Sequence, residues 1–231
     1  PAPMTAETFA GRRLMILLFD TSSMQPEDMQ TAIDSAVTWT TESMSAADMV
    51  AVATVGSRLQ VLSDFSGDKA AVQRTLAALS ATDGTGTTVV DTSTAATDDA
   101  AASATEATTA TDAGTQELDT FNNDVRLRAL TALADALTPI QQKKAILYFS
   151  AGMARNGADN QVELRKAVNA AVRANVSIYP VDARGLQAIV PGGSARSASR
   201  GRVADFSGQA VTQQFGQIAA QQETLQSLAS D

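Results

Sequence analysis

A carboxylate and a hydroxyl stand directly after the most apolar run of the chain. Residues 14–19 read LMILLF, and Asp20 and Ser22 follow immediately. A short, wholly apolar run that ends in a polar turn predicts a strand buried on both faces. Asp20 and Ser22 would then lie at the carboxyl end of that strand, where open α/β sheets build their ligand sites. An aspartate with nearby hydroxyls can hold a hard divalent cation through oxygen atoms.

A structural role accounts for the same two residues without any ion. Asp and Ser side chains accept hydrogen bonds from the backbone N–H groups of turns and helix starts. A helix is expected directly afterwards, over about 26–45, because Pro26 suits a first helical turn and apolar residues recur at helical spacing. In this interpretation Asp20 and Ser22 cap the turn and the helix that follow the strand.

Composition excludes several kinds of chemistry. The 231 residues include no His and no Cys, which removes zinc–thiolate sites, disulfides and nucleophiles activated by histidine. We therefore expect no enzyme and no cofactor. The net charge of −8 disfavours nucleic acid and anionic membranes as partners. No apolar run approaches the roughly 20 residues of a membrane span, so we expect none within the chain.

Apolar runs and helical stripes alternate along most of the chain. This order predicts an α/β fold with a doubly wound, mostly parallel sheet flanked by helices, and one short antiparallel edge strand. The expected strands are 14–19, 49–55, 58–64 (the antiparallel one), 145–149 and 176–181, and the expected helices are about 26–45, 68–79, 122–137, 159–174 and 208–229.

Two segments interrupt the predicted single domain of residues 1–231. Residues 80–121 are rich in Thr, Ala and acids, which favours a solvated surface loop, with a recruiting surface for a cationic partner as the alternative. Residues 183–207 form a Gly/Ser/Arg-rich loop. Its basic residues are either solvated or contact an acidic protein partner; they are Arg184, Arg196, Arg200 and Arg202.

Three segments carry a resemblance to a known family. LLFDTSSMQPEDMQ, QKKAILYFSAGM and SIYPVDARGL resemble the von Willebrand factor A (VWA) domain, in particular its bacterial VWFA-related subgroup. The resemblance implies a metal-ion-dependent adhesion site built from three loops. The first loop supplies an Asp and two Ser, the second a Thr and the third an Asp. Asp20 and Ser22 match the first loop, but Met24 replaces its second Ser and Ala151 replaces the third-loop Asp.

The second-loop threonine has two candidate positions. Thr87 follows a glycine as in the family pattern, whereas the usual distance to the third loop points to Asn123 or Asp124. With one carboxylate left among the matched ligands, we expect a degenerate site that holds no ordered Mg²⁺ or Mn²⁺.

The resemblance and the absence of catalytic residues predict a non-catalytic protein-binding module for adhesion or scaffolding. The alternatives are a structural accessory subunit of a larger cell-surface or envelope assembly, and an adhesion domain with an atypical metal site. The resemblance implies a location outside the cytoplasm, so we expect a secreted, periplasmic or cell-surface protein. No signal peptide is visible, but the chain begins with Pro1 rather than Met, as in a fragment or a mature product that has lost its signal peptide. Residues 223–231 resemble the helix that precedes a final strand and helix in the family, so we expect a longer polypeptide or a partner strand beside 176–181.

Overall fold

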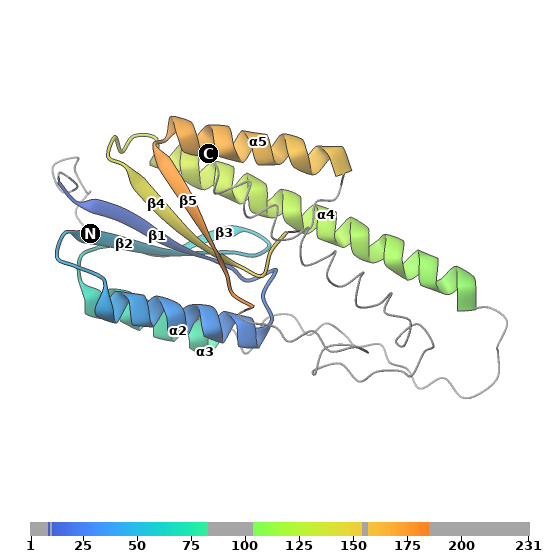
Figure 1. Ribbon diagram of the computed structural model, residues 1–231, viewed down its shortest axis with the longest axis horizontal. Coiled ribbons are helices and arrows are strands. Elements are labelled where there is room, and N and C mark those ends of the chain that lie inside the picture. The colour runs from blue at the N-terminus through green and yellow to red at the C-terminus, as the bar shows by residue number, and fades with distance from the viewer. Residues whose placement is uncertain (1–8, 10, 83–103, 154–156, 185–231) are drawn as a thin grey trace.

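The computed structural model describes residues 9, 11–82, 104–153 and 157–184. At residues 81–82, 104–120 and 157–159 it describes the backbone alone. Five strands form one sheet in this part of the chain (Figure 1). The strands are β1 (Arg13–Asp20), β2 (Asp48–Val55), β3 (Leu59–Ser66), β4 (Lys144–Ser150) and β5 (Val176–Asp182).

The strand order within this part is β3-β2-β1-β4-β5. β1 runs parallel to both β2 and β4, and β5 runs parallel to β4. Only β3, at one edge, is antiparallel to its neighbour β2. The predicted mostly parallel sheet with one antiparallel edge strand is therefore confirmed.

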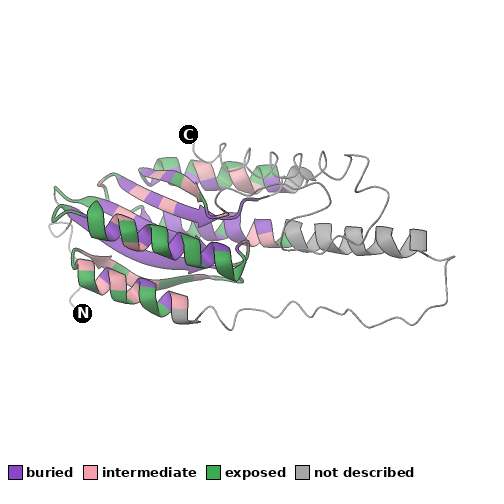
Figure 2. Ribbon diagram, turned by 60° about the horizontal axis from the view of Figure 1, so that its bottom comes forward, coloured by how far each residue is buried: buried purple, intermediate pink, exposed green. Residues whose placement is uncertain are grey.

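Helices cover both faces of the sheet. α2 (Pro26–Glu42) and α3 (Lys69–Thr82) lie on one face, and α4 (Ala104–Leu137) and α5 (Gly157–Arg173) lie on the other (Figure 1). β1 is buried between these layers at six of its eight positions. Figure 2 shows purple, buried strands in the interior of the molecule. The side chains of β1 alternate: Ile16 and Leu18 pack toward α4 and α5, whereas Leu17 and Phe19 pack toward α2 and α3. By the same alternation, Asp20 is directed to the side of α4.

The helix before β4 is much longer than the sequence pattern predicts. α4 begins at Ala104, so residues 104–121 of the expected surface loop are helical. The segment contains no proline, and its four alanines favour a helix, whereas its six threonines and Gly114 have lower helix propensity. Low hydrophobicity therefore did not indicate the backbone conformation of this segment. Residues 83–103 lie outside the described part.

An ion pair stabilises the end of the sheet at which the parallel strands β1 and β2 begin. The Arg13 guanidinium on β1 donates two hydrogen bonds to the fully buried Asp48 carboxylate on β2, at 2.6 and 2.8 Å. Ser45 adds its backbone N–H and its hydroxyl, at 2.8 and 2.9 Å. Burial pushes the pKa of Asp48 upward, but the hydrogen bonds from Arg13 and Ser45 outweigh it, so the pKa lies below its usual value.

This lowered pKa predicts an acid-sensitive contribution to stability. The Asp48 carboxylate stabilises the fold fully above its unfolded pKa of about 4, and the contribution is lost as the pH falls below that value toward the folded pKa. We therefore expect wild type to be more stable than Asp48→Asn at pH 7, and the gap to shrink on acidification. Urea unfolding of both proteins from pH 7 to pH 2 measures it, and a gap that stays constant would contradict the prediction.

The described helices include none that is long and apolar enough to cross a membrane. The expected helix at 208–229 lies outside the described residues, as does the loop 183–207 beyond Arg184.

Candidate functional site

The Asp20 side chain lies at the carboxyl end of β1, between β2 and β4, and is fully buried. Its Oδ1 atom accepts hydrogen bonds from the backbone N–H groups of Ser22 and Ser23, each at 3.2 Å. The Ser22 hydroxyl also donates to Oδ1, at 2.7 Å. Asp20 therefore caps the turn after β1, as the structural interpretation predicts, although α2 itself begins only at Pro26.

The second carboxylate oxygen of Asp20 accepts two further hydrogen bonds and meets one cation. The Tyr148 hydroxyl donates to Oδ2 at 2.8 Å and the Ser150 hydroxyl at 3.1 Å, both from β4. The Arg126 Nε atom forms an ion pair with the same oxygen at 3.2 Å. A carboxylate offers about four lone-pair positions, so the five hydrogen bonds and the ion pair with Arg126 saturate Asp20.

The Arg126 guanidinium comes from α4, and its side chain is only 7% exposed. Its Nε atom donates to the Ser22 hydroxyl at 2.9 Å, and Nη1 donates to the Asn123 amide oxygen at 2.9 Å. Arg126 and Asn123 lie on the same buried stripe as Leu127 and Leu130, at helical spacings of three and four residues. Along α4, the buried face therefore changes from polar residues (Asn123 and Arg126) to apolar ones (Leu127 and Leu130).

A second set of hydrogen bonds joins the turn after β1 to the turn after β4. The Ser23 and Ser150 hydroxyls lie 3.1 Å apart, and the Ala151 N–H donates to the Ser23 hydroxyl at 3.0 Å. The Gly152 N–H donates to the Ser150 hydroxyl at 3.0 Å, with Gly152 at a φ of 102°, a conformation that favours glycine. These contacts fix the first and third loops relative to each other.

Burial, together with the negative charge of Asp20, raises the pKa of the Tyr148 hydroxyl well above its usual value. The phenol therefore stays protonated over the physiological range and serves as a permanent donor to Asp20. It is not poised as an acid or a base.

Replacing Tyr148 by Phe is expected to lower the free energy of unfolding by about 1.5–3 kcal/mol, because it removes a hydrogen bond to a buried charge without changing the packing volume greatly. The matched control is Tyr179→Phe, since Tyr179 lies on the neighbouring strand β5 and is 52% exposed. The control is expected to stay within about 0.5 kcal/mol of wild type. Urea unfolding compares the three proteins, and equal losses in both variants would contradict the prediction.

The structure brings together some of the residues that the sequence singled out and separates others. Asp20 and Ser22 lie together, and Asn123, one of the alternatives for the second-loop role, reaches them through Arg126. Met24 and Ala151 are buried in the apolar layer beneath α2 and α3.

The candidate partner-binding arginines fall into two groups. Arg184 forms an ion pair with Asp182, at 2.8 Å between Nη2 and Oδ2, so its charge is balanced within the chain. Arg196, Arg200 and Arg202 lie outside the described residues, as does the second-loop candidate Thr87. Sequence reasoning missed Arg126 and Tyr148. The helical spacing of Asn123 and Arg126 from Leu130 was the signal that could have placed them on the buried face.

The donor set does not fit the divalent ion that the family resemblance implies. A hard cation needs free oxygen ligands, and magnesium sites use one or two carboxylates. Asp20 is saturated by protein donors, and the cationic Arg126 guanidinium contacts both Asp20 and Ser22. Across the described ranges, no group of three or more acidic, histidine or cysteine side chains could hold a metal.

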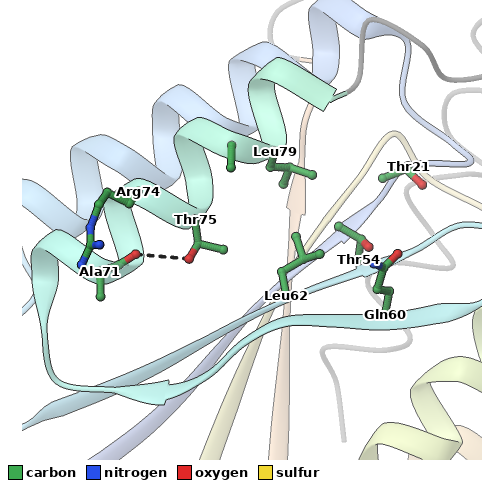
Figure 3. A pocket seen from close by; sticks show the side chains of 9 residues that line it. Thr21, Thr54, Gln60, Leu62, Ala71, Arg74, Thr75 and Leu79 are labelled. Carbon is green, nitrogen blue, oxygen red and sulfur yellow. Dashed lines mark hydrogen bonds between the residues drawn. The ribbon is translucent and has the colours of Figure 1, made fainter.

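A surface hollow of about 630 Å³ lies between α3 and the β2–β3 ribbon, and no residue of the Asp20 network lines it (Figure 3). Thr21, Thr54 and Gln60 line its sheet side, and Arg74 and Thr75 line its helix side. The Thr21 and Thr75 hydroxyls donate to backbone carbonyls, and Arg74 lies 3.9 Å from Asp68. No nucleophile with an adjacent base lines the hollow, so it offers shape and neutral hydroxyls rather than reactive groups.

No family model matches the chain. No curated protein matches it in sequence.

Solved structures give weak likenesses only. Protein BatB from Bacteroides thetaiotaomicron is 12% identical, with a TM-score of 0.44 over 90% of this chain and 98% of that one. An aerotolerance-related membrane protein from Bacteroides fragilis is 10% identical, with a TM-score of 0.44 over 95% of this chain and 100% of that one. Proximal thread matrix protein 1 from the mussel byssus is 12% identical, with a TM-score of 0.40 over 73% of this chain and 37% of that one.

This chain thus spans little more than a third of the mussel protein's length. At TM-scores of 0.44 or less, these similarities do not indicate a family, a ligand or a partner for this chain. The strand order and register alone define the class of fold, a doubly wound α/β domain with one antiparallel edge strand.

Proposed function

We propose that the chain is a non-catalytic protein-interaction domain of the von Willebrand factor A type, acting in adhesion or scaffolding outside the cytoplasm. The observation that supports this proposal is the saturation of Asp20 by five hydrogen bonds and one ion pair from its own chain. In open α/β sheets the carboxyl edge is where ligands bind. Here the polar groups at that edge hold the loops together, which leaves recognition to the surrounding surface.

Co-purification tests this proposal. The full chain is immobilised and exposed to an extract of the cells that produce it, once with Mg²⁺ and once with EDTA. The proposal expects one protein partner that is retained equally in both buffers and that co-elutes in a fixed ratio on size-exclusion chromatography. A partner retained only with Mg²⁺ would instead support an adhesion domain with an atypical metal site. Absence of any stoichiometric partner would contradict the proposal.

A structural accessory subunit of a larger envelope assembly is the second candidate. It is favoured by β5, which is the outermost strand on its side of the sheet in the described part of the chain. An edge strand can accept a strand from another polypeptide. However, Pro180 lies within β5, and proline provides no N–H for such pairing. A partner strand at 176–181 remains a prediction, and it would have to pair around this residue.

A further inference from the structure

The buried Asp20 carboxylate requires a compensating positive charge. A buried carboxylate is costly unless it is paired and hydrogen-bonded. In the described residues around Asp20, the positive charge is supplied by Arg126, whose Nε atom lies 3.2 Å from Oδ2. The other donors to Asp20 are neutral hydroxyls and backbone N–H groups.

The guanidinium contacts the same kinds of atoms that a hard cation would use. Its three partners are the Asp20 carboxylate, the Ser22 hydroxyl and the Asn123 amide oxygen, all of which are oxygen ligands suited to Mg²⁺ or Ca²⁺. A metal ion could reach them only by displacing the guanidinium. Both species are cations, so they would also repel each other at contact distance.

Two further residues fit the same explanation. Met24 and Ala151 stand where the resemblance implies a hydroxyl and a carboxylate ligand, and both pack in the apolar layer with Leu17 and Phe19. Compared with the family pattern, the site therefore lacks two oxygen ligands on the side of α2. It has a fixed cation, the Arg126 guanidinium, on the side of α4. With these two differences, the negative charge of Asp20 is balanced by Arg126 without a metal ion.

We propose that Arg126 is a built-in cation that takes the place of the divalent ion and keeps this crevice closed to metals. Arg126 is thus a positioning residue, which orders the first loop through Asp20 and Ser22 and joins it to α4 through Asn123. It has this role whether or not the domain binds a partner protein.

Restoring the two missing ligands separates this proposal from the simpler idea that the site only lacks ligands. The double variant Met24→Ser, Ala151→Asp regains a hydroxyl and a carboxylate but keeps Arg126. A triple variant adds Arg126→Ser. The matched control adds Arg128→Ser instead, because Arg128 is an exposed arginine on the same helix. Mn²⁺ binding to each protein is measured by calorimetry, and the melting temperature is measured with Mn²⁺ and with EDTA.

The proposal expects Mn²⁺ to bind the triple variant roughly tenfold or more tightly than the double variant, since the competing cation is gone. Mn²⁺ should also raise the melting temperature of the triple variant alone. The control should behave as the double variant does. Equal Mn²⁺ affinity in the double and triple variants would overturn the proposal. If the triple variant is unfolded in EDTA, recovery of the fold by Mn²⁺ supports the proposal, and failure to recover overturns it.

A second measurement on the wild-type chain does not depend on any variant folding. Bound Mn²⁺ broadens the NMR signals of nearby amides. The proposal expects the Ser22 and Ser23 amide signals to keep their widths during a Mn²⁺ titration. Selective broadening of these two signals would overturn it.

Discussion

Replacing Arg126 by Ala is expected to lower the free energy of unfolding by about 3–5 kcal/mol. This is the typical cost of breaking a buried ion pair by removing one partner, since it leaves a buried charge without compensation. Asp20 is fully buried and Arg126 is 7% exposed, so little water is available to replace the guanidinium. The Ser22 hydroxyl and the Asn123 amide would lose the same donor.

Arg128→Ala is the control for this loss. Arg128 lies two residues further along α4, is 66% exposed and reaches Asp124 only at 3.9 Å. An exposed pair of this kind contributes about 0–1 kcal/mol. Guanidinium chloride unfolding of wild type and both variants measures the difference. Similar losses for the two variants would show that Arg126 stabilises α4 in general and has no special role at Asp20.

Replacing Phe19 by Ala is the second change with a large expected effect, again about 3–5 kcal/mol of unfolding free energy. Phe19 is fully buried on β1 and stacks on Phe149 of β4, with ring centroids 4.7 Å apart and an interplanar angle of 7°. The truncation would leave a cavity directly beneath α2, and would remove an aromatic contact that joins the two central strands.

Phe121→Ala provides the comparison, because Phe121 lies on α4 and is 65% exposed. A surface substitution of this kind is expected to change stability by less than about 0.5 kcal/mol. Thermal and urea unfolding report both variants. A small loss for Phe19→Ala would contradict the packing of β1 against the α2–α3 layer.

Most of the fold could be predicted from the sequence because the strands are short apolar runs separated by helical stripes. The run 14–19 indicates a central strand because it is short, wholly apolar and followed by a polar turn, as is typical of a strand covered on both faces. The start of α4 could not be predicted in the same way. Residues 104–120 carry no apolar stripe and contain more threonine than alanine, so neither periodicity nor composition indicated that the helix after Asn122 extends back to Ala104.

The site was predictable in position but not in chemistry. Asp20 and Ser22 follow the central strand, and strand ends define the ligand edge of such sheets. Which polar residue of a distant helix meets Asp20 depends on how that helix lies across the sheet, which local sequence does not specify. Arg126 was not singled out from the sequence, and arginine is seldom buried without a partner. Its partner is more than 100 residues away in the chain.

Arg126 compensates the charge of Asp20 in place of a metal ion, and a double-mutant cycle measures this compensation. Unfolding free energies are measured in EDTA for wild type, Asp20→Asn, Arg126→Met and the combined variant. The account predicts a coupling energy of roughly 2–3 kcal/mol, because the combined variant no longer buries an unpaired charge. Additive effects within about 0.5 kcal/mol would contradict it.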